Sequence, residues 1–213
     1  MITIRVDNKK LTVKEGTNLL KACLDNDIYI PNLCYVEKMS HPPASCRLCF
    51  VEIEGEKHPI PACTVKVTRE IVVKTDSPGV RQLQKVALQL LLSVHHLDCR
   101  NCEANRKCAL QKIAKFLNVG LKSKHLDHFL KEMEIDQRHP FLNYYPNRCV
   151  LCGRCIHVCR DRNKQAQLTF ANRGFDTVIS FFIKPGAPPL QCDACRACIE
   201  ACPVAAILPK ISN

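Results

Sequence analysis

Two stretches in the last third of the chain, CVLCGRCIHVC at residues 149–159 and CDACRACIEACP at residues 192–203, repeat one cysteine spacing. This C-x2-C-x2-C-x3-C spacing is the bacterial ligand pattern for [4Fe–4S] clusters, and in two-cluster proteins the fourth cysteine of each run ligates the other cluster. Three cysteines within seven residues would crowd a single tetrahedral zinc ion. The spacing therefore favours two [4Fe–4S] clusters.

The crossed arrangement predicts two ligand sets, each built from three leading cysteines of one run and the last cysteine of the other. The sets are Cys149, Cys152, Cys155 and Cys202 for one cluster, and Cys192, Cys195, Cys198 and Cys159 for the other. Backbone N–H groups of such turns can point at the sulfurs and help to set the reduction potential.

Two further groups of candidate ligands lie upstream, and their spacing alone is ambiguous. The groups are Cys34, Cys46, Cys49 and Cys63, and then His95, Cys99, Cys102 and Cys108. The first group resembles a plant-type [2Fe–2S] arrangement with a longer first gap. Either group also suits tetrahedral zinc. In the second group, His96 competes with His95, and Asp98 is a weaker candidate.

The number of cysteines limits the classes of protein to which the chain can belong. The 213-residue chain has 16 cysteines and starts with an alternating, strand-like segment rather than the apolar core of a secretion signal. No apolar run reaches the roughly 18 residues of a membrane span. We therefore expect a cytoplasmic protein in which dense cysteines are metal ligands rather than disulfides. Cys23 is left over, and its apolar helical setting predicts a buried, inert thiol.

The basic charge first suggests a nucleic-acid partner. The formal net charge is +11, counted with neutral cysteines. Cluster ligands are thiolates, so four oxidised clusters would remove about seven units and leave about +4. Tryptophan is absent, and no aromatic residues interleave with the basic ones as in RNA-binding motifs. A zinc-stabilised nucleic-acid-binding protein remains as the alternative from a different class.

Local patterns predict an α+β fold in residues 1–76. Alternating segments at 2–6 and 11–13 indicate a hairpin across residues 7–10. Thr17 is expected to cap a short helix through Leu24, and residues 50–53 and 71–74 are strand-like. The pattern predicts a sheet with one helix across it.

Helices are expected to dominate residues 77–139. Ser77 and Pro78 suit the start of a helix, which then runs through Leu83, Val86, Leu90 and Val94 to His95. A second helix is expected from Ala104 to Val119, and residues 122–139 are expected to form a solvated linker. In residues 140–213, the segments 167–170 and 177–183 flank a turn and predict a hairpin between the cysteine runs.

The order of the four groups resembles a known iron–sulfur module. It is similar to the N-terminal region of the large iron–sulfur subunit of complex I and to the multimeric [FeFe]-hydrogenases. It most resembles the small diaphorase iron–sulfur subunit of soluble NAD-reducing hydrogenases. The matching motifs are HHLDCRNC at 95–102 with CALQ at 108–111, and RCVLCGRC at 148–155.

The resemblance implies one [2Fe–2S] cluster and three [4Fe–4S] clusters, with His95 rather than His96 as a ligand. It implies three domains: a β-grasp [2Fe–2S] domain at 1–76, a small helical histidine-ligated [4Fe–4S] domain with its linker at 77–139, and a bacterial-type two-cluster ferredoxin-like domain at 140–213. All eight cysteines of the paired runs are present, which favours the hydrogenase side of the family. Arg196 and Ala205 replace glycines that are usual near the second run.

The resemblance also implies a function. We expect a non-catalytic electron-relay subunit of a hetero-oligomer, without nucleic acid. Its partners would be a flavin-bearing NAD(P)H-oxidising subunit and a catalytic subunit, with a hydrogenase favoured over a formate dehydrogenase or an electron-bifurcating NADH:ferredoxin oxidoreductase. A free soluble ferredoxin is a further alternative. Because the sequence ends eleven residues after Cys202, we expect no substrate site in it.

Overall fold

The computed structural model describes residues 1–37, 39–122, 127–164, 167–181 and 192–210. The chain falls into two units. One contains Met1–Leu90 with Ile113–Val119, and the other contains Leu91–Lys112 with Gly120–Asn213. Among the helices of the described residues, none has the length and apolar character needed to cross a membrane.

A five-stranded mixed sheet with the order β2-β1-β5-β3-β4 organises the first unit. Its strands are β1 (Ile2–Val6), β2 (Lys9–Val13), β3 (Phe50–Ile53), β4 (Ile60–Pro61) and β5 (Val72–Lys74). β1 and β2 form the predicted hairpin, with Ile2 opposite Val13. β5 lies parallel to β1, and β3 lies antiparallel to β5. The predicted hairpin and later strands are confirmed.

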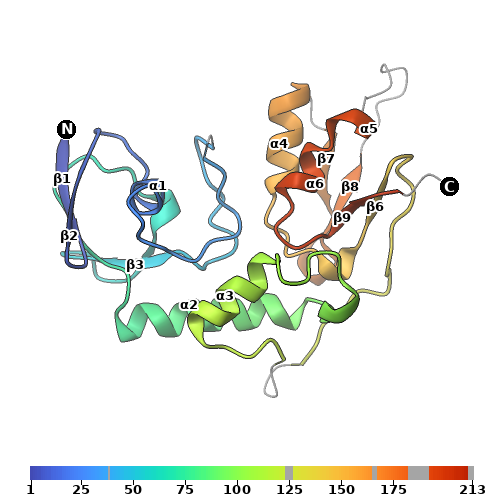
Figure 1. Ribbon diagram of the computed structural model, residues 1–213, viewed down its shortest axis with the longest axis horizontal. Coiled ribbons are helices and arrows are strands. Elements are labelled where there is room, and N and C mark those ends of the chain that lie inside the picture. Colours follow the sequence, from blue (N-terminus) through green and yellow to red (C-terminus); the bar gives the residue numbers. More distant parts are fainter. Residues whose placement is uncertain (38, 123–126, 165–166, 182–191, 211–213) are drawn as a thin grey trace. The chain divides into compact units, whose positions relative to one another are not determined.

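α1 (Leu19–Leu24) lies beside the sheet and packs into its core (Figure 1). The prediction that Thr17 caps this helix was wrong, because the cap is Asn18. The Asn18 side chain accepts the N–H of Lys21 at 3.2 Å and donates to the carbonyl of Cys63 at 2.6 Å. One side chain therefore fixes both the helix start and a segment that carries a candidate ligand, η1 (Ala62–Thr64).

α2 (Pro78–Ser93) begins where the sequence predicts, because the Ser77 hydroxyl accepts the N–H of Val80 at 3.2 Å. It ends before Val94 and His95, so the expected C-terminus was too late. The apolar residues used for the prediction lie on the exposed side, Leu83 at 37% and Leu90 at 57% exposed, whereas Leu88 is buried. In so leucine-rich a helix, periodicity alone does not select the buried stripe.

α3 (Ala109–Leu117) begins later than predicted. Residues 103–107 form turns instead, and Arg106 has a left-handed backbone with φ of 66°. A residue in that conformation cannot continue a right-handed helix. The short helix η2 (Cys99–Asn101) precedes these turns, so candidate ligands lie in irregular backbone on the N-terminal side of α3.

Two small antiparallel sheets and several short helices build the rest of the second unit (Figure 1). β6 (Leu142–Tyr144) pairs with β9 (Ile207–Pro209), and β7 (Leu168–Ala171) pairs with β8 (Val178–Phe181). The helices are η3 (Pro146–Arg148), α4 (Arg154–Asn163), η4 (Gly174–Asp176), α5 (Cys192–Cys195) and α6 (Ala197–Ala201). The predicted hairpin at 167–183 is confirmed to Phe181, and its last residues lie outside the described part.

The segment predicted as a linker is mostly exposed between residues 127 and 139, but two of its polar residues are buried, Asp136 and His139. Two hydrogen bonds of 2.7 and 2.9 Å tie the backbone of Lys131 to the side chain of Asn147. A bridge joins Asp136 to Tyr144. This segment therefore packs along the second unit, and the limits of the three predicted domains stay predictions.

Candidate metal centres

The first candidate set lies in the first unit, with Cys34, Cys46 and Cys49 in loops and Cys63 in η1. Its four cysteines, Cys34, Cys46, Cys49 and Cys63, are all buried. Arg47 has a left-handed backbone with φ of 52°, which turns the loop sharply between the second and third thiols. Backbone N–H groups of Leu48 and Leu33 make hydrogen bonds to the Cys46 thiol. Such N–H donors stabilise negative charge on sulfur.

Hydrogen bonds within this set give its thiols different pKa values. The Sγ atoms of Cys34 and Cys46 lie 3.5 Å apart. Hydrogen bonding with the thiols of Cys46 and Cys63 lowers the pKa of Cys34, and the same interactions raise the pKa of Cys46 and of Cys63. Four thiolates so close together would repel one another, so the set fits a group that brings positive charge and soft-ligand chemistry.

The second candidate set lies between α2 and α3. Cys108 is buried, while Cys99 and Cys102 are half-buried. Burial raises the pKa of Cys108, and the charges of Cys102 and Cys99 raise it further. These three thiols are therefore electrostatic neighbours.

Of the two adjacent histidines, His95 is the buried one. Its ring donates a hydrogen bond to the backbone of Arg148, and burial lowers its pKa to about 4. Its Nδ1 atom is buried and has no hydrogen-bond partner. His96 is exposed, and the carboxylate of Asp98 accepts hydrogen bonds from Asn101. A neutral imidazole with an unsatisfied buried nitrogen fits a metal ligand, because such atoms are otherwise rare.

The paired runs occupy two helical segments of the second unit, α4 with its preceding loop and α5–α6, and α4 packs against α6. Burial raises the pKa of Cys155, and the charges of Cys149, Cys152 and Cys202, with a smaller effect of Cys198, raise it further. Burial also raises the pKa of Cys198 to about 12, with added effects of Cys159 and Cys192. The fourth cysteine of each run thus lies near cysteines of the other run.

Left-handed backbone positions shape the turns around these cysteines. Leu151 and Ala205 have φ of 51° and 52°, and Arg196 has φ of 47°. The N–H of Leu151 donates to Cys149 Sγ at 3.4 Å, and the N–H of Ala206 donates to Cys202 Sγ at 3.2 Å. Arg196 and Ala205, which the resemblance places at usual glycine positions, therefore adopt the conformation that favours glycine.

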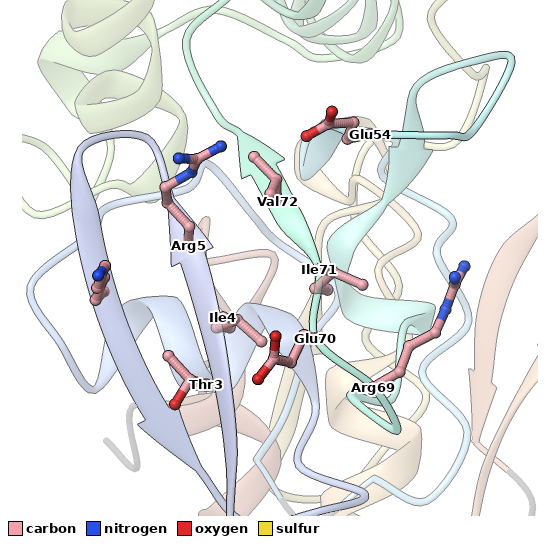
Figure 2. A pocket seen from close by; sticks show the side chains of 9 residues that line it. Thr3, Ile4, Arg5, Glu54, Arg69, Glu70, Ile71 and Val72 are labelled. Carbon is pink, nitrogen blue, oxygen red and sulfur yellow. The ribbon is translucent and has the colours of Figure 1, made fainter.

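A cavity elsewhere in the first unit contains no candidate ligand. It has a volume of about 520 Å³ and is lined by charged side chains of both signs, among them Arg5, Glu54, Arg69 and Glu70 (Figure 2). In the part of the chain that the structure describes, no three or more His, Cys, Asp or Glu side chains are arranged as a site for a single metal ion.

Family models match successive segments of the chain, in the same order as the cysteine sets. Residues 1–78 match the 2Fe-2S iron-sulfur cluster binding domain. Residues 84–121 match the NADH-ubiquinone oxidoreductase-G iron-sulfur binding region. Residues 139–208 match the ferredoxin-like domain of NADH-quinone oxidoreductase subunit 3.

Individual relatives point to the same family. The chain is 33% identical to NADPH-Fe(3+) oxidoreductase subunit alpha of Geobacter sulfurreducens over 99% of its length, and 32% identical to NADP-reducing hydrogenase subunit HndD of Solidesulfovibrio fructosivorans over 98%. A crystal structure of NAD+-reducing [NiFe]-hydrogenase in the H2-reduced state superposes on it with a TM-score of 0.85, at 27% identity, over 100% of this chain and 88% of the other. The chain belongs to the iron–sulfur family that NAD(P)-reducing hydrogenases share with complex I.

Members of this family differ greatly in length. The chain spans 24% of the Geobacter subunit, 36% of HndD and 28% of the NADH-ubiquinone oxidoreductase 78 kDa subunit of Neurospora crassa, to which it is 29% identical. The iron–sulfur family resemblance predicted from the order of the cysteine sets is confirmed, as are both cluster-binding types. The ligand of each individual cluster stays a prediction.

Two side chains of this family member interact with the candidate ligands without being part of the cysteine pattern. Tyr144 and Cys149 are electrostatic neighbours, and each changes the pKa of the other. Asn163 Nδ2 donates to Cys159 Sγ at 3.4 Å. The four-residue step from Cys159 to Asn163 along a helix could have suggested the second contact. Nothing in the sequence suggests the first, because it depends on how β6 packs.

Proposed function

We propose that the chain is an electron-relay subunit that holds one [2Fe–2S] cluster and three [4Fe–4S] clusters. The observation that carries this proposal is the approach of Cys202 to Cys149, Cys152 and Cys155. A two-cluster ferredoxin-like site needs this exchange between distant runs. Separate zinc sites would instead collect all their ligands around single ions.

The proposed ligand sets follow the four groups. They are Cys34, Cys46, Cys49 and Cys63 for the [2Fe–2S] cluster, then His95, Cys99, Cys102 and Cys108, then Cys149, Cys152, Cys155 and Cys202, and finally Cys192, Cys195, Cys198 and Cys159 for the [4Fe–4S] clusters. The sheet order β2-β1-β5-β3-β4 around α1 supports a β-grasp description of the first unit. Iron–sulfur clusters, when bound, supply one-electron transfer.

The residues of the chain would position and tune these groups. Burial of most candidate cysteines keeps water away from the sulfurs, and N–H groups such as those of Leu151 and Ala206 donate to them. His95 stays neutral because its pKa is lowered to about 4. A neutral ligand in place of a thiolate makes the centre less negative and favours electron uptake there.

We further propose partners on both sides of the relay: a flavin-bearing NAD(P)H-oxidising subunit and a hydrogenase. The support is that a chain of an NAD+-reducing [NiFe]-hydrogenase matches this one along 88% of its own length. The Geobacter relative, an NADPH-Fe(3+) oxidoreductase subunit, supports a second candidate with the same electron source and another terminal partner. A formate dehydrogenase or an electron-bifurcating partner and a cytoplasmic location remain predictions of the sequence.

The test is anaerobic purification of the tagged chain from its own host. We expect a brown complex that contains a flavoprotein subunit, and we expect NADH or NADPH to bleach its visible absorbance. A chain that purifies alone and is bleached by dithionite but by neither nucleotide would contradict the proposed partners. Hydrogen-dependent bleaching distinguishes a hydrogenase from another terminal partner.

A further inference from the structure

Two backbone hydrogen bonds join the second candidate set to the third, the one that contains Cys149, within the second unit. The N–H of His96 donates to the carbonyl of Asn147 at 2.6 Å, and the N–H of Ala109 donates to the carbonyl of Pro203 at 3.0 Å. Each of these four bonded residues lies within two positions of a candidate ligand. The backbone therefore holds the first and last ligands of the second set beside the third set.

The middle of the second set lies in a loop whose backbone hydrogen bonds are local. The N–H of Cys102 donates to the carbonyl of Cys99 at 3.4 Å, and the N–H of Asn105 donates to the carbonyl of Cys102 at 2.9 Å. Both of these cysteines are half-buried, and Arg106 has a left-handed backbone. Local bonds of this kind shape the loop, but they do not fix its place relative to the third set.

An ion pair ties this loop to the third set. Glu103 follows Cys102, and its Oε2 atom lies 2.6 Å from Nη1 of Arg148, which precedes Cys149. The Arg148 side chain is 16% exposed, and its guanidinium carbon lies 4.2 Å from the centre of the Tyr145 ring. Stacking on an aromatic ring holds the planar guanidinium in one orientation, so less freedom is lost when it pairs with a carboxylate. Because the carboxylate is exposed, the pair adds little to stability, and its effect is on where the loop lies.

We propose that Arg148 is a positioning residue whose ion pair with Glu103 fixes the separation of the two [4Fe–4S] clusters that the second and third sets would bind. This rests on the proposed function. The protein supplies a redox cofactor with position and surroundings, while the chemistry is that of the cofactor. Electron transfer between two centres slows steeply as their separation grows, so a loop held in one place keeps the rate uniform. One electron leaves one cluster and reduces the other, and no bond forms or breaks.

This ion pair differs from two other ion pairs of the second unit in what it joins. Arg138 and Asp136 are two positions apart, and Lys164 and Asp161 are three apart, so each of those pairs lies within one segment. The pair of Glu103 and Arg148 spans 45 positions. Of these three pairs, it alone connects two candidate sets.

The experiment compares Glu103→Ala with Asp161→Ala in the anaerobically purified full chain with its partners. Asp161 is a matched control because it is also an exposed carboxylate in an ion pair and lies two residues from a candidate ligand, whereas its partner Lys164 is local. The readout is the magnetic interaction between the two reduced clusters, measured as splitting of their EPR signals and as faster spin relaxation. We expect Glu103→Ala to reduce and broaden this splitting with all the iron retained. Asp161→Ala should keep the splitting of the wild-type chain.

A second variant, Glu103→Asp, keeps the carboxylate but shortens the side chain by one methylene. Either the ion pair breaks or the loop moves to keep it, so the splitting should change in both cases.

An unchanged splitting with full iron content in Glu103→Ala would overturn this inference and leave the proposed function intact. If that variant loses iron, an unchanged splitting in Glu103→Asp overturns it. An equal change in Asp161→Ala would show an effect of lost charge and would overturn it too, as would a fully loaded wild-type chain whose clusters show no magnetic interaction. A wild-type chain without iron and acid-labile sulfide would instead overturn the proposed function.

Discussion

His95 and His96 are adjacent and chemically identical in the sequence, yet the fold separates them. His95 is 7% exposed, and its Nδ1 atom has no hydrogen-bond partner. His96 is exposed, and its backbone N–H is bonded to the carbonyl of Asn147 at 2.6 Å. The burial of its unpartnered nitrogen thus favours His95 over His96 as the ligand, which is the choice that the family resemblance implies.

Replacement of His95 by cysteine tests this choice. A thiolate in place of a neutral imidazole adds one negative charge, so the reduction potential of that centre should fall, on the order of 100 mV by comparison with the effect of histidine ligands in Rieske centres. The measurement is an anaerobic EPR titration, with His96→Gln as the control that leaves the potential unchanged. A potential that stays the same or rises in His95→Cys would rule out His95 as a ligand.

The backbone conformation of Ala205 leads to a prediction about stability. Its φ of 52° is the left-handed conformation, which costs a residue with a Cβ about 1 kcal/mol relative to glycine. Ala205→Gly should therefore raise the apparent unfolding temperature and keep all the iron. Gly153→Ala is the reverse test, because φ is 71° there and its Cβ would lie 3.5 Å from the Phe170 ring. If both variants had the unfolding temperature of the wild-type chain, this account would be contradicted.

At the scale of elements, short helices bring the two cysteine runs together. α4 has 10 residues, α5 has 4 and α6 has 5, too few for stability in isolation. Cys155 and Cys159 lie one turn apart in α4. The charges of Cys149, Cys152 and Cys202, and to a smaller extent that of Cys198, act on Cys155, and the charge of Cys159 acts on Cys198. This arrangement would allow the proposed exchange of the fourth ligand between the runs.

The exchange predicts which cysteine substitutions act on the same cluster. Cys202→Ser should alter the EPR signal that Cys149→Ser alters, and Cys159→Ser should alter the one that Cys198→Ser alters. Each substitution should lower the iron content by up to about four atoms. Cys23→Ala is the control, because Cys23 is fully buried in the sheet core and its loss should cost stability but no iron. If Cys202→Ser shared its signal with Cys198→Ser instead, the crossed assignment would be wrong.

The sequence predicts regular elements well where a local pattern sets them. The alternation in β1 and the Ser77–Pro78 helix start are examples, since each depends on neighbouring residues only. The start of α3 could not be predicted from apolar spacing, because the left-handed Arg106 breaks the helix. The buried side of α2 and the interaction of Tyr144 with Cys149 depend on tertiary packing. For the candidate centres, the cysteine spacing predicted the ligand residues. The choice between iron–sulfur clusters and zinc for the two upstream sets also needed the order of the four sets, which resembles that of a known family.

At the scale of the whole molecule, the two units should depend on the clusters to different degrees. The first unit has a core around β1 and α1 that is mainly aliphatic and includes only two of the candidate ligands, Cys49 and Cys63. The second contains the shortest helices, with cysteines as a large part of their sequence. Metal binding supplies folding free energy to such segments.

Removal of the clusters by chelation in denaturant and return to buffer should therefore affect the units unequally. We expect amide hydrogen exchange to accelerate strongly in α5 and α6, while the β1–β2 hairpin stays protected. Mass-spectrometric exchange of the holo and apo chains measures this. Equal loss of protection in both regions would show that the sheet also depends on the clusters.

The central claim is that the cysteines hold iron–sulfur clusters rather than zinc. Most of the formal positive charge of +11 then offsets the negative charge of the thiolate-bound clusters. Metal and acid-labile sulfide analysis of the anaerobically purified chain tests this most directly. We predict about fourteen iron atoms and about fourteen acid-labile sulfides per chain, as clusters of these types require. A colourless protein with about four zinc ions and no sulfide would contradict the account.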